Sequence, residues 1–184
     1  MSWRQVRSVE DIMPRILAVI IELFVCICAL WIISFLSTLL HELGHAVGYM
    51  LATGDGHWHI RVGWGKRFLD TKALTVNLLV FDGFFTPSEK KIDTKTKLVV
   101  TLLGGPAASL LLIVGLMALR FGRLSLQSNF FADDAIEFFL NSTLTINMCI
   151  LVLSLAPARY FYGEIKGLET DGLQIINALK RHSD

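Results

Sequence analysis

A long apolar run near the N-terminus constrains the fold of this chain more than any other feature. From Ile16 to about Thr53 the residues are apolar or small, and only Glu22 and the group at 41–45 interrupt them. As one helix this run is roughly 55 Å long, against a hydrocarbon core of about 30 Å. It predicts either a strongly tilted helix that projects from a membrane, or a break near Ser34 to Ser37 that lets the run cross twice.

Composition places the rest of the chain in the same class. Hydrophobic residues make up 53% and charged residues 18%, whereas soluble domains carry about 25% charged residues. Two more apolar runs, at 98–119 and 136–156, are long enough to cross a bilayer. We therefore expect an all-α membrane protein with about three to four transmembrane helices, forming one domain over residues 1–184.

Three segments outside these runs have their own character. Residues 1–15 are polar and mildly basic, and Pro14 favours a helix start just after them. Residues 57–85 are rich in β-branched and aromatic side chains, which predicts a small β-rich, membrane-associated insert of two or three strands. Residues 170–182 predict an amphipathic helix.

Charge and cysteine usage exclude some classes of function. The net charge of +1, without a dominant basic face, argues against a nucleic-acid partner. All three cysteines lie in apolar runs, so they predict neither a disulfide framework nor a cysteine zinc site.

The distribution of Lys and Arg predicts the orientation in the membrane. With three spans, the segment 54–97, which contains the insert, and the C-terminal tail share one side and hold 12 of the 17 basic residues. Cytoplasmic loops carry an excess of Lys and Arg. We therefore expect the insert and the tail in the cytoplasm, in a multi-pass protein.

The apolar run contains the sequence His41-Glu42-Leu43-Gly44-His45, an HExxH pattern. Histidines at i and i+4 of a helix share one face and can bind one Zn²⁺, and the Glu that follows the first ligand can act as general base. Three ionisable side chains in an apolar membrane segment are costly unless something compensates them. A bound metal does so more plausibly than a chance pairing of histidines.

A zinc site needs a third protein ligand from elsewhere in the chain. Asp171 is the first candidate because it opens the last predicted helix just after the last span, and Asp82 is the second. His57 and His59 alternate on one predicted strand and are better explained as surface residues.

Three motifs together resemble the site-2 protease family of intramembrane metalloproteases: HELGHA at 41–46, GGPAAS at 104–109, and Pro157 followed by Thr170-Asp171-Gly172. The resemblance spans about residues 30 to 175. It implies zinc held by His41, His45 and Asp171, with Glu42 as the base and the GGP element lining the site. The implied substrate is a membrane-embedded protein or peptide, cut in or near its transmembrane segment.

The family often carries Asn where this chain has Ser109 and Ser154. Asn147, two helical turns before Ser154, either replaces that amide as a catalytic donor to the oxyanion or makes an interhelical hydrogen bond. The alternative function is a catalytically inactive relative that binds membrane helices or acts as a scaffold. No feature of the sequence indicates the oligomeric state.

Overall fold

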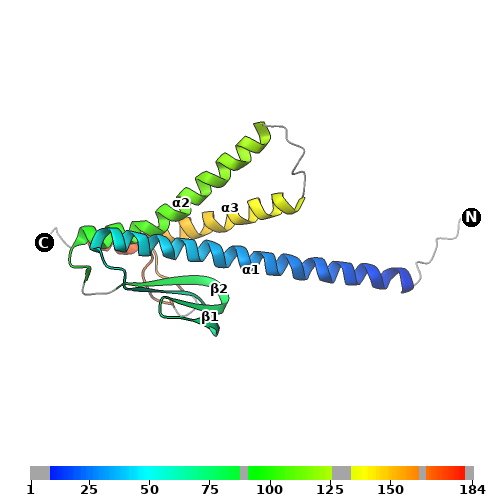
Figure 1. Cartoon of the computed structure of the whole chain (residues 1–184), viewed down its shortest axis with the longest axis horizontal. Coiled ribbons are helices and arrows are strands. Elements are labelled where there is room, and N and C mark those ends of the chain that lie inside the picture. Colours follow the sequence, from blue (N-terminus) through cyan, green and yellow to red (C-terminus); the bar gives the residue numbers. More distant parts are fainter. Residues whose placement is uncertain (1–8, 88–90, 126–133, 162–164, 181–184) are drawn as a thin grey trace, which may run out of the picture.

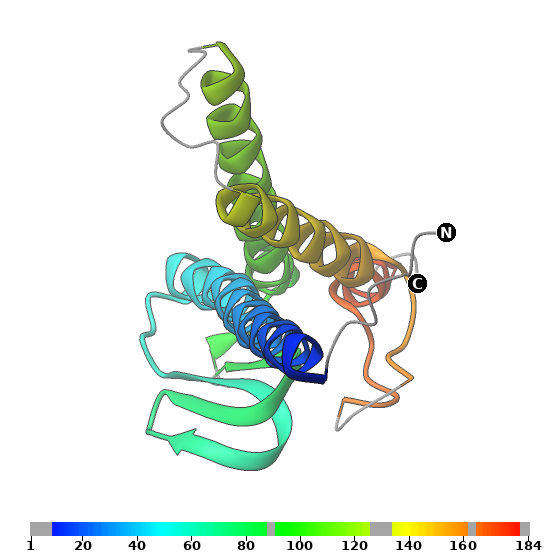
Figure 2. The ribbon, with the colours of Figure 1, turned by 90° about the vertical axis from the view of Figure 1, so that its right-hand side faces the viewer.

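Four helices and two strands make up the part of the chain that this computed structural model describes, residues 9–87, 91–125, 134–161 and 165–180. In chain order they are α1 (Val9–Thr53), β1 (Trp58–Asp70), β2 (Leu74–Pro87), α2 (Lys95–Ser125), α3 (Asp134–Leu155) and α4 (Asp171–Lys180). The first part of α2 packs on the C-terminal part of α1 and its later part rises away, α3 lies beside α1, and the strands lie on another side of α1 (Figure 1, Figure 2). The predicted combination of helices and a small β-rich insert is therefore confirmed.

Helix α1 is a single unbroken helix of 45 residues. No break occurs at residues 34–37, so the long run forms one helix. The helix starts at Val9, earlier than expected, and contains Pro14; near a helix end a proline removes only one backbone hydrogen bond. Gly54 ends the helix in a left-handed conformation, with φ of 69°, and its N–H donates to the Met50 carbonyl at 2.8 Å.

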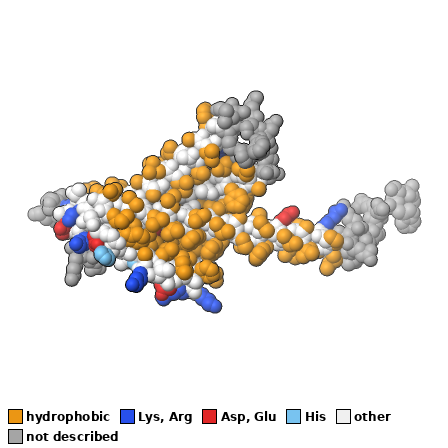
Figure 3. Space-filling model, in the orientation of Figure 1, with side chains coloured by type: hydrophobic (Ala, Val, Ile, Leu, Met, Phe, Trp, Pro, Cys, Tyr) orange, Lys and Arg blue, Asp and Glu red, His pale blue; other side chains and the backbone are white. Residues whose placement is uncertain are grey.

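Three of the described helices are long and apolar enough to cross a membrane, over Ile12–Thr53, Lys95–Gly122 and Ala135–Leu155. Large apolar side chains along them point outward, as the orange surface in Figure 3 shows. Soluble monomers rarely expose apolar patches of this extent. The surface therefore fits a lipid environment.

The two strands form a small antiparallel sheet that bends at several bulges. Residues 58–62 of β1 pair with 83–87 of β2, and residues 60–62 also pair with 74–76. Residues 64–70 pair with 75–79. The inner face packs on α1 through Ile60, Val62 and Val80, which form a buried cluster with Ala46. This packing fixes the second part of β2 beside the HExxH turn of α1.

A short connection returns the chain from α3 to α4. Arg159 and Glu169 form an isolated bridge, and the Thr170 hydroxyl bonds to the Ala156 carbonyl. Helix α4 covers Asp171–Lys180 of the predicted 170–182, and the last two predicted positions lie outside the described residues, as do positions 1–8. The connection places the start of α4 at the end of α3, next to α1.

Candidate metal centre

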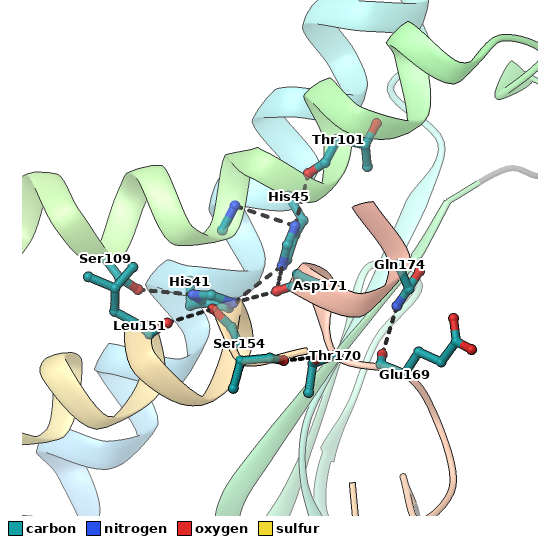
Figure 4. Close-up of polar contacts among 12 residues, drawn as sticks. His41, His45, Thr101, Ser109, Leu151, Ser154, Glu169, Thr170, Asp171 and Gln174 are labelled. Carbon is teal, nitrogen blue, oxygen red and sulfur yellow. Dashed lines mark hydrogen bonds and ion pairs between the residues drawn. The ribbon is translucent and has the colours of Figure 1, made fainter. Parts of the chain in front are cut away.

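His41 and His45 project from one face of α1 toward the same point (Figure 4). Both are buried, with 5% of each residue exposed, and their Nε2 atoms lie 3.3 Å apart. The helical i, i+4 spacing accounts for this arrangement, because residues four apart are neighbours on one face.

The other ring nitrogen of each histidine has a partner on α2. His45 Nδ1 lies 2.9 Å from the carbonyl oxygen of Thr101, and His41 Nδ1 lies 2.9 Å from the hydroxyl of Ser109. The Gly105 N–H also lies 3.3 Å from His45 Nδ1. Both rings are therefore held through Nδ1, and their Nε2 atoms face each other and Asp171. Partners of this kind orient metal-binding histidines and fix their tautomer.

Asp171, at the first position of α4, completes the group from the other end of the chain. Its Oδ2 lies 3.5 Å from His41 Nε2 and 3.3 Å from His45 Nε2. Burial raises the pKa of this carboxyl, but hydrogen bonds and charge from the two histidines outweigh burial and lower the pKa to about 2. Asp171 is therefore ionised at neutral pH, the state that a metal ligand requires.

These three residues can hold a metal ion. Tetrahedral coordination with bond lengths of 2.0–2.1 Å places ligand atoms about 3.3–3.4 Å from one another. The three distances between the facing atoms, 3.3, 3.5 and 3.3 Å, match that spacing. The donor set of two imidazole nitrogens and one carboxylate oxygen is therefore already arranged around a common centre.

Glu42 is buried beside this group and borders the cavity in front of it. Its side chain packs on the backbone of β2: a Cβ at Gly83 would lie 2.7 Å from Glu42 Cγ and 2.8 Å from its Cδ. A glycine at position 83 is what allows the strand to approach the carboxylate so closely. The edge of β2 and the candidate base thus face the same space.

The glycines of the GGP element bring α2 against the histidines. A Cβ at Gly105 would lie 2.8 Å from His41 Nε2 and closer still to the ring of His45. A Cβ at Gly104 would meet the backbone of Gly44. These contacts place the GGP element beside the site, as the resemblance implies, and its small residues let the two helices approach closely.

A cavity of about 390 Å³ opens in front of the histidines. It is bordered by α1, by the second part of β2, by the start of α2 and by the C-terminal connection with α4. This volume lies in the range of ligand-binding sites. The metal centre therefore lies at the wall of a space that can hold more than water.

A comparison with protein-family models, with curated proteins and with solved structures gives no match. The case for a function therefore depends on the geometry of the site and on the motifs.

The other predicted candidates lie elsewhere. Asp82 is buried next to a smaller cavity of about 80 Å³ that also borders Glu42, outside the group of three ligands. Asn147 is fully buried, and its amide donates to Ser37 Oγ on α1 and to the Thr143 carbonyl, both at 2.8 Å. The bond to Ser37 is the interhelical hydrogen bond that was one of the two interpretations of Asn147. The other, a catalytic role for Asn147, stays a prediction.

The histidines of the insert are engaged away from the centre. His57 Nδ1 lies 2.6 Å from Asp55 Oδ1, and His59 Nε2 lies 3.1 Å from the Thr75 hydroxyl. Neither histidine belongs to the group that could hold a metal among the described residues.

Two residues of the site were not recognised from the sequence in the roles that they have. Ser109 was a departure from a family pattern and, beside Asn147, a candidate to stabilise the oxyanion, whereas in the structure its hydroxyl contacts His41. Thr101 contributes a backbone carbonyl, which no side-chain pattern can reveal. The position of Ser109 within GGPAAS was the one available signal.

Proposed function

We propose that this chain is an intramembrane zinc metalloprotease that resembles the site-2 protease family. The observation that carries the proposal is the convergence of His41, His45 and Asp171 beside Glu42, within a body of three membrane-length helices. Zinc suits the donor set because nitrogen and carboxylate ligands in tetrahedral geometry are typical of its sites.

Bound zinc would polarise the scissile carbonyl and lower the pKa of a bound water to about 7. Glu42 accepts the proton of the attacking water and passes it to the leaving amine, as a general base and then a general acid. Ser109 and the Thr101 carbonyl hold the two imidazoles in orientation. The substrate must unwind locally, because a membrane helix satisfies its backbone internally.

The second part of β2 offers a binding mode for the unwound segment. Gly83, Phe84 and Phe85 border the cavity together with the candidate base. An extended peptide can add to such an edge through backbone hydrogen bonds. The peptide bond would then lie next to Glu42, since Gly83 contacts that side chain.

The proposal is tested by comparing membranes that contain wild-type protein, Glu42→Gln or Glu22→Gln. Glu22 is a matched control because it lies in the same helix, exposed and far from the site. Wild type and Glu22→Gln should produce new protein N-termini in or near apolar segments, detected by mass spectrometry, and Glu42→Gln should not. Identical N-termini in all three membranes would favour the inactive relative.

We place the insert and the C-terminal tail in the cytoplasm because the segment 54–97 and the tail together hold 12 of the 17 Lys and Arg residues. Trypsin should then cleave between Lys66 and Lys72, near the turn that joins β1 and β2, in inside-out vesicles and not in sealed right-side-out vesicles. Cleavage only in right-side-out vesicles would show that the insert and the tail lie on the opposite side of the membrane.

A further inference from the structure

The cavity extends well beyond the metal centre. Its volume of about 390 Å³ is more than ten times the roughly 30 Å³ that one water occupies in the liquid. Large aliphatic side chains line the part of the cavity that is formed by residues 92–102 and by the C-terminal connection, which we call its aliphatic end. They are Ile92, Leu98, Leu102, Ile165 and Leu168.

The polar groups that border this end are already paired. Arg159 donates to Glu169 Oε1 at 3.1 Å, and Asn177 donates to Glu169 Oε2 at 3.0 Å. The Gln174 amide donates to the backbone carbonyl of Glu169 at 2.9 Å, as Figure 4 shows. With both carboxylate oxygens engaged, little remains here to compensate a buried charge, so an apolar group fits best.

The aliphatic end is connected to the metal centre through α2. Leu102 is 8% exposed and directly follows Thr101, whose carbonyl orients His45. Across the cavity, the ring of Phe85 on β2 stacks near that of His45, with centroids 6.2 Å apart. Side chains of an extended peptide alternate between its two faces. A peptide along β2 with its carbonyl at the centre therefore directs a neighbouring side chain toward the aliphatic end.

We propose that this end of the cavity is a specificity pocket for one large aliphatic or aromatic side chain next to the scissile bond, with Leu102 as its main determinant. The inference rests on the proposed function and adds the substrate class. Peptides with Leu, Ile, Met or Phe at that position are preferred, and peptides with Ala or an acidic residue are disfavoured. Burying leucine rather than alanine favours binding by about 50-fold at most.

The test measures binding rather than turnover. Blocked tripeptide hydroxamates that differ only in one side chain, Leu, Ala or Glu, are titrated into zinc-loaded full-length protein in detergent micelles. The Leu compound should bind at least about tenfold more tightly than the Ala compound, and the Glu compound most weakly. Leu102→Trp fills the pocket and should abolish the preference for Leu while the Ala compound still binds.

Leu103→Trp is the matched control, because Leu103 is the next residue of the same helix and 45% of it is exposed; it should keep the preference. Leu168→Trp is the second pocket variant, on a residue 42% exposed that tolerates enlargement more easily, and it should weaken the preference. Equal affinity of wild type for the Leu and Ala compounds overturns the pocket.

The two proposals fail in different ways. If hydrolysis requires Glu42 but does not depend on the side chain next to the scissile bond, the protease proposal is supported and the pocket proposal is wrong. If the protein binds the hydroxamates selectively but no cleavage depends on Glu42, the pocket proposal is supported and the protease proposal is wrong. If zinc-loaded protein binds none of the compounds, both proposals are wrong.

Discussion

Replacing Gly105 with alanine should remove the metal site while leaving the helices intact. The added methyl group points at the histidine rings rather than into lipid or solvent. Its Cβ would lie 2.8 Å from His41 Nε2, and still closer to His45 Nε2. Both atoms are the ones that face Asp171. The substitution thus acts on the metal ligands themselves.

The size of the effect follows from these distances. Ordinary contact with a Cβ begins near 3.4 Å, so His41 Nε2 must retreat by about 0.6 Å, and His45 by more. Metal–ligand distances tolerate only about ±0.2 Å. Loss of a group that merely orients a ligand already costs about 10–100-fold in metal affinity. Direct displacement of two ligands should therefore weaken zinc binding by more than about 100-fold.

The assay is zinc affinity by chelator competition, with circular dichroism as the check on folding. Gly115→Ala is the control, because Gly115 lies in the same helix and its Cβ would meet nothing within 4 Å. Alanine is the better helix former, so Gly115→Ala should keep zinc affinity and be neutral or slightly stabilising. If Gly105→Ala binds zinc within twofold of wild type, the proposed position of the ion is wrong.

Three further predictions test neighbouring parts of the structure. Asp171→Asn should abolish stoichiometric zinc in elemental mass spectrometry, whereas Asp82→Asn should retain it. Ser109→Ala should weaken zinc by about 10–100-fold without loss of helix content, because His41 loses its orienting partner. Tyr49→Phe should lower the melting temperature at neutral pH, because the Tyr49 hydroxyl and His57 lower the pKa of Asp55 to about 2. A carboxyl group whose pKa is lowered by folding stabilises the protein above the pKa that it has in the unfolded chain, and this stabilisation is lost as the pH falls through the folded pKa. The melting temperatures of wild type and Tyr49→Phe should therefore converge between about pH 4 and pH 2.

Local periodicity predicted the features that depend on a single helix. The apolar runs gave the three membrane-length helices, and the spacing of His41 and His45 placed both rings on one face. Its place at the start of the last predicted helix made Asp171 the first candidate for the third ligand, and the resemblance to a family implied the same residue; the structure brings it to within 3.5 Å of both histidines. Spacing alone had left Asp82 open as a rival.

Contacts that arise from packing between helices could not be predicted from local sequence patterns. Where a break in α1 was one of two alternatives, the helix continues and Ser37 accepts a hydrogen bond from Asn147 on α3. The Ser109 contact requires α2 to lie so close that only Gly104 and Gly105 fit there. Such contacts join positions more than sixty residues apart, and no local pattern encodes them.

The length of α1 leads to one more prediction, about its tilt. Its exposed apolar part runs from Ile12 to Leu40, about 43 Å along the axis, whereas the hydrocarbon core is about 30 Å thick. The helix fits inside only if it tilts by about 45°, well above the average of about 20°. Such a tilt would bring His41 and His45 toward the boundary where Lys and Arg of the hairpin reach water. Infrared dichroism of oriented bilayers should report this tilt for the helices on average; a mean near 20° would mean that the first turns of α1 leave the bilayer or are covered by another chain.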